Sequence, residues 1–567
     1  MAATRLPVLA LVNGRILTMD PATPVVPALR LEGERIAAVG GRDVAIGDGA
    51  DVRVVDLAGR TVTPGLIDGH AHMDREGLRD RYPSLEHAQS IEDIVDTIRR
   101  LAAPTPHGEW IVTMPVGAPP FYFDPASGLA EGRLPDRHDL DRAAPNHPVY
   151  VRGIWGYWDR PPITSIANSA ALARCGIDRA TEPPCESVEI VRDDAGEPTG
   201  LFREHDPLPV LEFTLFRDVP RFSHEDRIEG IRIAQRRYHS SGVTGTYEAH
   251  GVSPDVLAAY EALHAVGELT MRCRLVASPT WTTPDGAADA IAGPLRLFAG
   301  THGSGDDRLR TAGVFVGIGE PGCVARTLQA GLPYTGWAGF VEWEHPIDDF
   351  EAIARMAATA DLRVHTLGND EAIIAATLDA LDRIDAAEPI AGRRWVLEHL
   401  RFADRRTLER IRALGLVVTT QPAGYIWKAG SSMVTGDADP EQFVPHRALD
   451  EAGVSFALST DDKPYSSMWA LWAAVGRVDR RTGRVLGPGQ RLGVRRALRA
   501  LTADAARLSF DEASRGVIRP GHLADLAIFN EDPEAVPVER LRDLPIWATV
   551  VGGHAVYGTD AALEELG

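Results

Sequence analysis

The two ends of the chain alternate apolar and polar residues in short runs, the pattern of half-buried β-strands. At the N-terminus such runs cover residues 10–20, 28–40 and 52–64, and Asn13-Gly14 is a turn signal within them. Residues 515–530 and 547–558 near the C-terminus have the same pattern. Two β-rich ends around a different middle predict one β-sandwich domain, built from residues 1–63 and 511–567.

The middle of the chain follows a different period. Helical patterns of 10–15 residues alternate there with short apolar runs that are typical of buried strands. The apolar runs are residues 243–249, 362–367, 394–400, 416–420 and 454–460. Such alternation indicates βαβ units and a parallel sheet, so the fold class is α/β, and a (β/α)₈ TIM-like barrel over residues 64–510 is the natural closure.

This barrel is longer than the roughly 250 residues that a plain one needs. The excess falls at about residues 75–222, where Pro, Arg, Asp and aromatic residues are frequent and periodicity is weak. We interpret this stretch as an insertion near the barrel mouth. A separately folded subdomain without a role at the mouth is the alternative.

Composition narrows the classes of function. The chain has 567 residues and a formal net charge of −21, which argues against a nucleic-acid-binding protein. Four cysteines cannot form a disulfide framework. No apolar stretch reaches the roughly 18 residues of a membrane span. We therefore expect a cytoplasmic enzyme with a small-molecule substrate, no nucleic-acid or membrane partner, and a homodimer as the common oligomer.

The strongest chemical signal is the end of the apolar strand at Leu66-Ile67. It continues into Asp68-Gly69-His70-Ala71-His72. Residues two apart in a strand point the same way, so His70 and His72 face one side at the strand's end. Two imidazoles in this position can share a metal ion, although solvated loop histidines give the same pattern.

Three further polar residues stand at the ends of apolar strands. They are His365, His399 and Asp461. The carboxyl ends of barrel strands meet at one mouth, so these side chains are expected to converge there with His70 and His72. Each one alone is as readily explained by an ordinary hydrogen bond. Together they predict a metal centre.

Motifs in order along nearly the whole chain resemble the amidohydrolase superfamily, in its amidohydrolase-3 branch of YtcJ-like proteins and N-substituted formamide deformylases. The segments that carry the resemblance are residues 13–18, 32–40, 64–72, 165–177, 199–204, 243–249, 364–372, 397–401, 419–424, 458–464 and 521–526. The resemblance implies a metal-dependent hydrolase of C–N bonds in a small non-peptide amide, N-substituted formamide or cyclic amide.

The resemblance also implies the residue roles. His70 and His72 bind a first metal, and His365 and His399 bind a second or contact the substrate. Asp461 is both ligand and general base. The expected cofactor is a divalent metal, with zinc in first place, as one or two ions.

One departure from the family pattern changes the expected metal centre. Many members carry a carboxylated lysine on the fourth barrel strand that bridges two metals, but here that position falls on Phe315 or Val316. Either one metal suffices, or another carboxylate bridges, with Glu204 and Glu320 as candidates for bridging or substrate contact. A mononuclear decarboxylase, lyase or isomerase on the same barrel is the alternative function.

Some other side chains remain open at this stage. Cys323 is either a metal ligand or a buried structural cysteine. Lys463 is either a contact for an anionic substrate or a solvent-facing lysine. Aromatic residues are candidates for an apolar substrate pocket or for ordinary core packing, namely Trp155, Tyr157, Trp158, Tyr425 and Trp427.

Overall fold

A parallel eight-stranded sheet forms the centre of the molecule, here described from a computed structural model. The structure describes residues 8–47, 52–118, 126–154, 162–206, 209–277, 284–292, 300–319, 322–330, 335–337, 339 and 344–566. The strands, in spatial order, are β8 (Leu66–Ala71), β14 (Val243–Val252), β15 (Arg272–Ala277), β16 (Leu309–Phe315), β19 (Val364–Leu367), β20 (Val396–Glu398), β21 (Val417–Thr420) and β22 (Ser455–Leu458).

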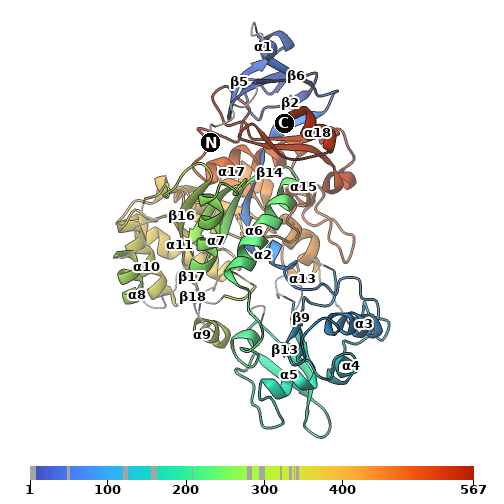
Figure 1. Cartoon of the computed structure of the whole chain (residues 1–567). Helices are drawn as coiled ribbons and strands as arrows, with labels where there is room; N and C mark the ends of the chain where they lie inside the picture. Colours follow the sequence, from blue (N-terminus) through green and yellow to red (C-terminus); the bar gives the residue numbers. More distant parts are fainter. Residues whose placement is uncertain are drawn as a thin grey trace.

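Helices follow these strands and pack around the sheet (Figure 1). They include α6 (His224–His239), α7 (Pro254–Ala265), α10 (Ile347–Thr359), α11 (Glu371–Asp385), α12 (Arg405–Ala413) and α14 (His446–Ala452). Apolar faces of these helices and the outer faces of the strands form one large core. The sequence prediction of an α/β barrel is therefore confirmed.

Both chain ends contribute to a pair of antiparallel-rich sheets beyond the barrel. The first sheet holds β5 (Arg35–Gly40), β4 (Ala28–Glu32), β1 (Val8–Val12) and β6 (Val52–Asp56). The second holds β25 (His554–Gly558), β24 (Ile546–Val551), β23 (Leu526–Phe529), β7 (Thr61–Pro64), β2 (Arg15–Leu17) and β3 (Val25–Val26). Val62 lies opposite Ile528 in the β7–β23 pair, so the two ends share one sheet. The exact domain limits stay a prediction.

The long connection after β8 folds around a sheet of its own. This inserted sheet holds β12 (Val188–Arg192), β13 (Pro198–Glu204), β11 (Ile163–Ala167), β10 (Val149–Val151) and β9 (Ile111–Thr113). Helix α3 (Ile91–Ala102) covers it with the buried face of Ile94, Val95 and Ile98. Trp155, Tyr157 and Trp158 lie outside the described residues.

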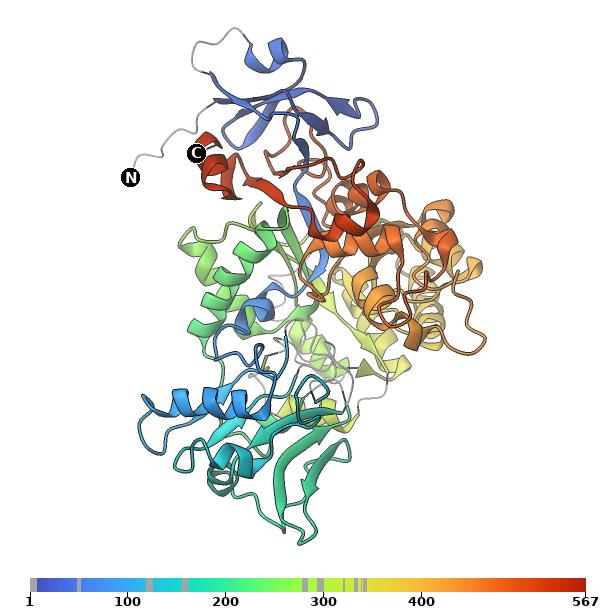
Figure 2. The same ribbon diagram turned by 90° about the vertical axis from the view of Figure 1, so that its right-hand side faces the viewer.

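The inserted region lies at the carboxyl end of the barrel strands. Helix α2 (Met73–Leu78) begins directly after β8, and its last residue packs against Met114, Phe222 and Trp337. The β-domain lies at the other end, because β7 leads into β8 within two residues. Figures 1 and 2 both show the barrel between these two parts.

Among the described residues, no helix combines the length and the apolar character that crossing a membrane requires.

Candidate metal centre

The buried carboxylate of Asp68 links the first barrel strand to the segment after the last one, next to the site. Asp68 on β8 accepts hydrogen bonds from the backbone N–H of His70 at 3.1 Å and of Thr460 at 3.0 Å. The N–H of Asp461 in turn donates to the carbonyl of His70 at 2.8 Å. Burial raises the pKa of Asp68 to about 7. The first and last strands are thereby joined, which brings His70 and Asp461 together.

Five buried side chains converge at this end of the barrel. They come from β8, β14 and the segments directly after β8, β20 and β22, and they are His70, His72, His250, His399 and Asp461. His399 Nε2 lies 3.1 Å from His70 Nε2 and 2.9 Å from His250 Nε2. His72 Nε2 lies 3.2 Å from Asp461 Oδ1. His70 belongs to both possible ligand groups, so the five form one cluster.

The spacing in the cluster fits a cation. Ligands about 2.1 Å from a tetrahedral ion lie roughly 3.4 Å from one another. Distances of 2.9 to 3.7 Å separate His399 Nε2 from its neighbours His250, His70 and Asp461 Oδ2. Imidazole nitrogens and a carboxylate are a donor set that suits zinc and similar divalent ions.

Electrostatics keep these groups in their metal-binding forms. Burial is the largest cause that lowers the pKa of His70, His72 and His399 well below the usual value, and Arg75 adds to it for His72, so these three rings stay neutral. Burial opposes ionisation of Asp461, but the Lys463 charge and a hydrogen bond from His72 outweigh it and hold the pKa of Asp461 well below the usual range. Neutral imidazoles beside an ionised carboxylate favour a cation.

The backbone at the cluster is unusual. His250, His399 and Asp461 have φ values of 56°, 63° and 53°, in the left-handed region that residues other than glycine rarely adopt. The ladder between β14 and β15 also shifts register between Glu248 and Val252, around His250. Such backbone conformations cluster at functional sites, where surrounding contacts hold them.

Sequence reasoning missed His250. The apolar pattern predicts a strand that ends at Ala249, whereas β14 continues to Val252. The available signal was the one that singled out His365 and His399, a histidine at the end of an apolar strand.

His365 lies beside the cluster but outside both groups of ligand atoms. Its Nδ1 lies 3.0 Å from Glu398 Oε1, and its Nε2 lies 3.1 Å from the Tyr247 hydroxyl, which accepts a hydrogen bond from Arg363. Both ring nitrogens therefore have protein partners. Burial lowers the pKa of His365, so this ring is also neutral. A role in metal or substrate binding stays a prediction.

Two cations hold Asp461 in place. Arg75 donates to Asp461 Oδ1 at 3.1 Å and to Asp462 Oδ2 at 2.9 Å, and Lys463 Nζ contacts Asp461 Oδ2. Lys463 is only 7% exposed, so the interpretation as a solvent-facing lysine is wrong. The Asp461 carboxylate thus keeps one orientation toward the histidines.

The candidate bridging residues lie in different places. Phe315 is buried against the cluster, with its ring centroid 5.5 Å from that of His250. Glu204 lies in the inserted sheet, where it accepts hydrogen bonds from the N–H groups of Val210 and Leu211, and burial raises its pKa to about 8. Glu320 lies outside the described residues. Cys323, at the start of α9 (Cys323–Ala330), packs against the core of the inserted region.

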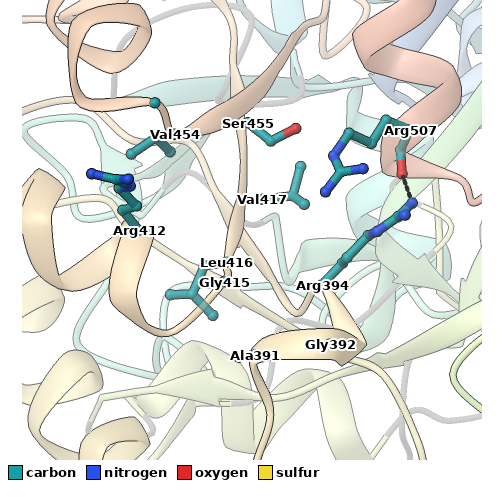
Figure 3. A pocket seen from close by; sticks show the side chains of 11 residues that line it. Ala391, Gly392, Arg394, Arg412, Gly415, Leu416, Val417, Val454, Ser455 and Arg507 are labelled. Carbon is teal, nitrogen blue, oxygen red and sulfur yellow. Dashed lines mark hydrogen bonds between the residues drawn. The ribbon is translucent and has the colours of Figure 1, made fainter.

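A cavity of about 340 Å³ lies at the opposite end of the barrel, where β20, β21 and β22 begin. Arg394, Arg412 and Arg507 line it, and Arg394 donates to the carbonyl of Arg507 at 2.7 Å (Figure 3). The histidine cluster is at the carboxyl strand ends, so this cavity is separate from the candidate metal centre.

Comparison with known proteins agrees with the site. The model of a family described as the amidohydrolase family matches residues 53–557. The chain belongs to the amidohydrolase family. This membership makes it a metal-dependent hydrolase, and the cluster of histidines and Asp461 is where this amidohydrolase can hold a divalent metal.

Individual relatives are distant but cover most of the chain. An N-substituted formamide deformylase of Arthrobacter pascens is 26% identical over 563 residues, covering 97% of this chain and 98% of its own. The putative amidohydrolase YtcJ of Bacillus subtilis is 25% identical over 525 residues, covering 89% and 90%. A solved structure of an uncharacterized metal-dependent hydrolase from Pyrococcus furiosus aligns with a TM-score of 0.67 at 22% identity, covering 93% of this chain and all of its own. That likeness shows the fold.

Proposed function

We propose that this amidohydrolase hydrolyses the C–N bond of a small non-peptide amide, with N-substituted formamides as the first substrate class. Cyclic amides are the next class. The observation that carries the chemistry is the convergence of four buried histidines and one ionised aspartate. The similarity over 97% of the chain to an N-substituted formamide deformylase supports the substrate class.

The proposal gives each side chain a task. His70 would hold the cation together with one of its two partner pairs, His250 with His399 or His72 with Asp461, which leaves a position for water, and zinc stands in first place. The bound cation would lower the pKa of water and polarise the substrate carbonyl. Asp461 would take the proton of the attacking water and deliver it to the leaving nitrogen. Arg75 and Lys463 keep the Asp461 carboxylate ionised and oriented for that transfer.

We further propose that one cation suffices. A bridging carboxylate beside His250 would occupy the place where the Phe315 ring packs. Phe315 is 1% exposed and offers no ligand atom. Glu204, the other described candidate for a bridging carboxylate, accepts hydrogen bonds from two backbone N–H groups of the inserted region with one of its oxygens.

The test is formate release. The purified chain is stripped with a chelator, reloaded with zinc and incubated with a panel of N-alkyl and N-aryl formamides, with the matching acetamides and small cyclic amides beside them. We expect formate and the free amine in equal amounts, loss of activity on stripping and recovery with zinc. Asp461→Asn should lower kcat by about 10²–10⁴-fold, the usual effect of losing a general base.

Asp437→Asn is the matched control, because Asp437 is exposed. It should leave kcat unchanged. If the zinc-loaded chain hydrolyses no member of the panel, the proposed substrate class is wrong.

A decarboxylase, lyase or isomerase on the same barrel is the second candidate, and the apolar Phe315 at the lysine position is what favours it. Incubation with a panel of aromatic carboxylates distinguishes the two. Carbon dioxide release without formate release from formamides would favour the decarboxylase.

A further inference from the structure

Tyr425 lies on a rare backbone element next to the metal centre. It belongs to the π-helical segment η4 (Ala423–Ala429), which follows β21. π-helical turns are uncommon and occur frequently at functional sites, because the wider turn displaces a side chain from its regular position. In this segment the N–H of Tyr425 donates to the carbonyl of Gln421 at 3.0 Å, and the side chain is half-buried.

The phenol oxygen of Tyr425 contacts one histidine of the cluster. Tyr425 Oη lies 2.6 Å from His399 Nδ1. The other nitrogen of the same ring, His399 Nε2, is the atom that lies 2.9 Å from His250 Nε2 and 3.1 Å from His70 Nε2. The ring therefore presents one nitrogen to Tyr425 and the other to the centre of the cluster.

This geometry selects a tautomer. A neutral imidazole has a single N–H, and a nitrogen that binds a cation must offer its lone pair. With Nε2 toward the cluster, the hydrogen of His399 belongs on Nδ1, where it is donated to Tyr425 Oη. A partner at the second nitrogen is the usual way in which proteins fix the tautomer and orientation of a metal-binding histidine.

His399 has particular need of such support. Its backbone is left-handed, with φ of 63°, and it stands one residue beyond the end of β20 at Glu398. Tyr425 is itself braced, since the Arg401 guanidinium lies 5.2 Å from the centroid of its ring. The two residues come from neighbouring strand ends, which makes the contact a tie between β20 and β21.

We propose that Tyr425 is a positioning residue that fixes His399 in the Nδ1-protonated tautomer and thereby sets the cation affinity of the site. Tyr425 acts through His399 and needs no contact with the substrate. The proposal rests on the proposed function only in that the cluster binds a divalent cation.

Zinc affinity of the Tyr425→Phe variant tests the inference, measured by competition with a chromogenic chelator. Phenylalanine keeps the ring and removes only the oxygen, so folding should be preserved. Loss of an outer partner of a metal ligand commonly costs about 10- to 100-fold in affinity, and this loss is expected here. Tyr82→Phe is the control, because its hydroxyl bonds to the carbonyl of Pro220 in the inserted region, and it should bind zinc like the wild type.

A second readout separates positioning from a purely structural role. At saturating zinc, Tyr425→Phe should recover kcat and KM to within a few-fold of the wild type, because only occupancy of the site changes. Zinc affinity of Tyr425→Phe equal to that of the wild type would overturn the inference and leave the proposed function intact. Failure of the wild type itself to bind zinc would overturn the metal centre and the inference together.

Discussion

At the scale of single residues, the cluster depends on side chains held on strained backbone. His250, His399 and Asp461 each have positive φ, and each is less than 7% exposed. A left-handed conformation costs a non-glycine residue about 1–3 kcal/mol, so it persists only where surrounding contacts require it. Here the surrounding contacts direct the side chains of these three residues toward the centre of the cluster.

His250 gives the sharpest prediction at this scale. Its Nε2 lies 2.9 Å from His399 Nε2, inside the cluster. His250→Gln should therefore weaken zinc binding by more than the roughly 10- to 100-fold that an outer partner costs. Equilibrium competition with a chelator measures this. His264→Gln, on α7 and paired with Asp306, is the control. Unchanged affinity in His250→Gln would remove His250 from the site.

His365 should behave differently, because Glu398 and Tyr247 occupy its two ring nitrogens. His365→Gln should retain zinc at the wild-type stoichiometry, with an affinity within a few-fold. Metal analysis of the variant after gel filtration measures this. Loss of zinc as complete as in His250→Gln would show that His365 is a ligand after all.

At the scale of elements, the position of residues at strand ends explains why the sequence could predict most of the site. The carboxyl ends of parallel strands share one mouth, so histidines after β8 and β20 and Asp461 after β22 could be expected to meet. Sequence reasoning missed His250 because the apolar pattern ends at Ala249, whereas β14 continues through the left-handed His250 to Val252. The orientation of the His365 ring could not be predicted from sequence either, because Glu398 and Tyr247, which bond to its two nitrogens, lie on other strands.

Asp68 links the first and last strands, and its loss should be costly. Its carboxylate accepts the N–H groups of His70 and Thr460, both buried. Asp68→Ala leaves these donors unpaired, which costs roughly 1–3 kcal/mol for each group. We expect a lower thermal midpoint and weaker zinc binding together. Asp68→Asn, which keeps an acceptor oxygen, should retain more of both, and equal losses in the two variants would contradict this account.

The raised pKa of Glu204 predicts that the stability of the inserted sheet depends on pH. Burial raises the pKa of Glu204 in the folded chain to about 8 from its ordinary value of 4.5, so between these pH values this carboxyl is ionised in the unfolded chain and protonated in the folded chain. Stability conferred by the neutral form therefore falls as pH rises. Glu204→Gln should raise the thermal midpoint at pH 8 and have little effect at pH 4.5. An equal shift at both values would contradict the raised pKa.

At the scale of the whole molecule, the β-domain is joined to the barrel through buried charges. Arg272 on β15 donates to both carboxylate oxygens of Asp525, which immediately precedes β23, and the same carboxylate accepts the N–H of Gly552. Arg272 is 1% exposed and Asp525 is 5% exposed. The barrel and the C-terminal strands are therefore expected to unfold together.

Removal of one partner tests this coupling. Asp525→Ala leaves the Arg272 charge buried and unpaired, which typically costs about 3–5 kcal/mol. Calorimetry should show a single unfolding transition that is shifted to a lower temperature. Asp543→Ala, whose side chain is 69% exposed, is the control and should leave the midpoint unchanged. A separate early transition of the β-domain would show that the two parts are not coupled.

The central claim is that the cluster of four histidines and Asp461 binds one divalent cation at the barrel mouth. Anomalous diffraction at the zinc edge from crystals of the zinc-loaded chain tests it most directly. We predict a single peak in this cluster, within bonding distance of His70 and of the other ligand atoms of one of its two groups, His250 with His399 or His72 with Asp461. A map without a peak there, or with a second zinc beside His365, would contradict the account.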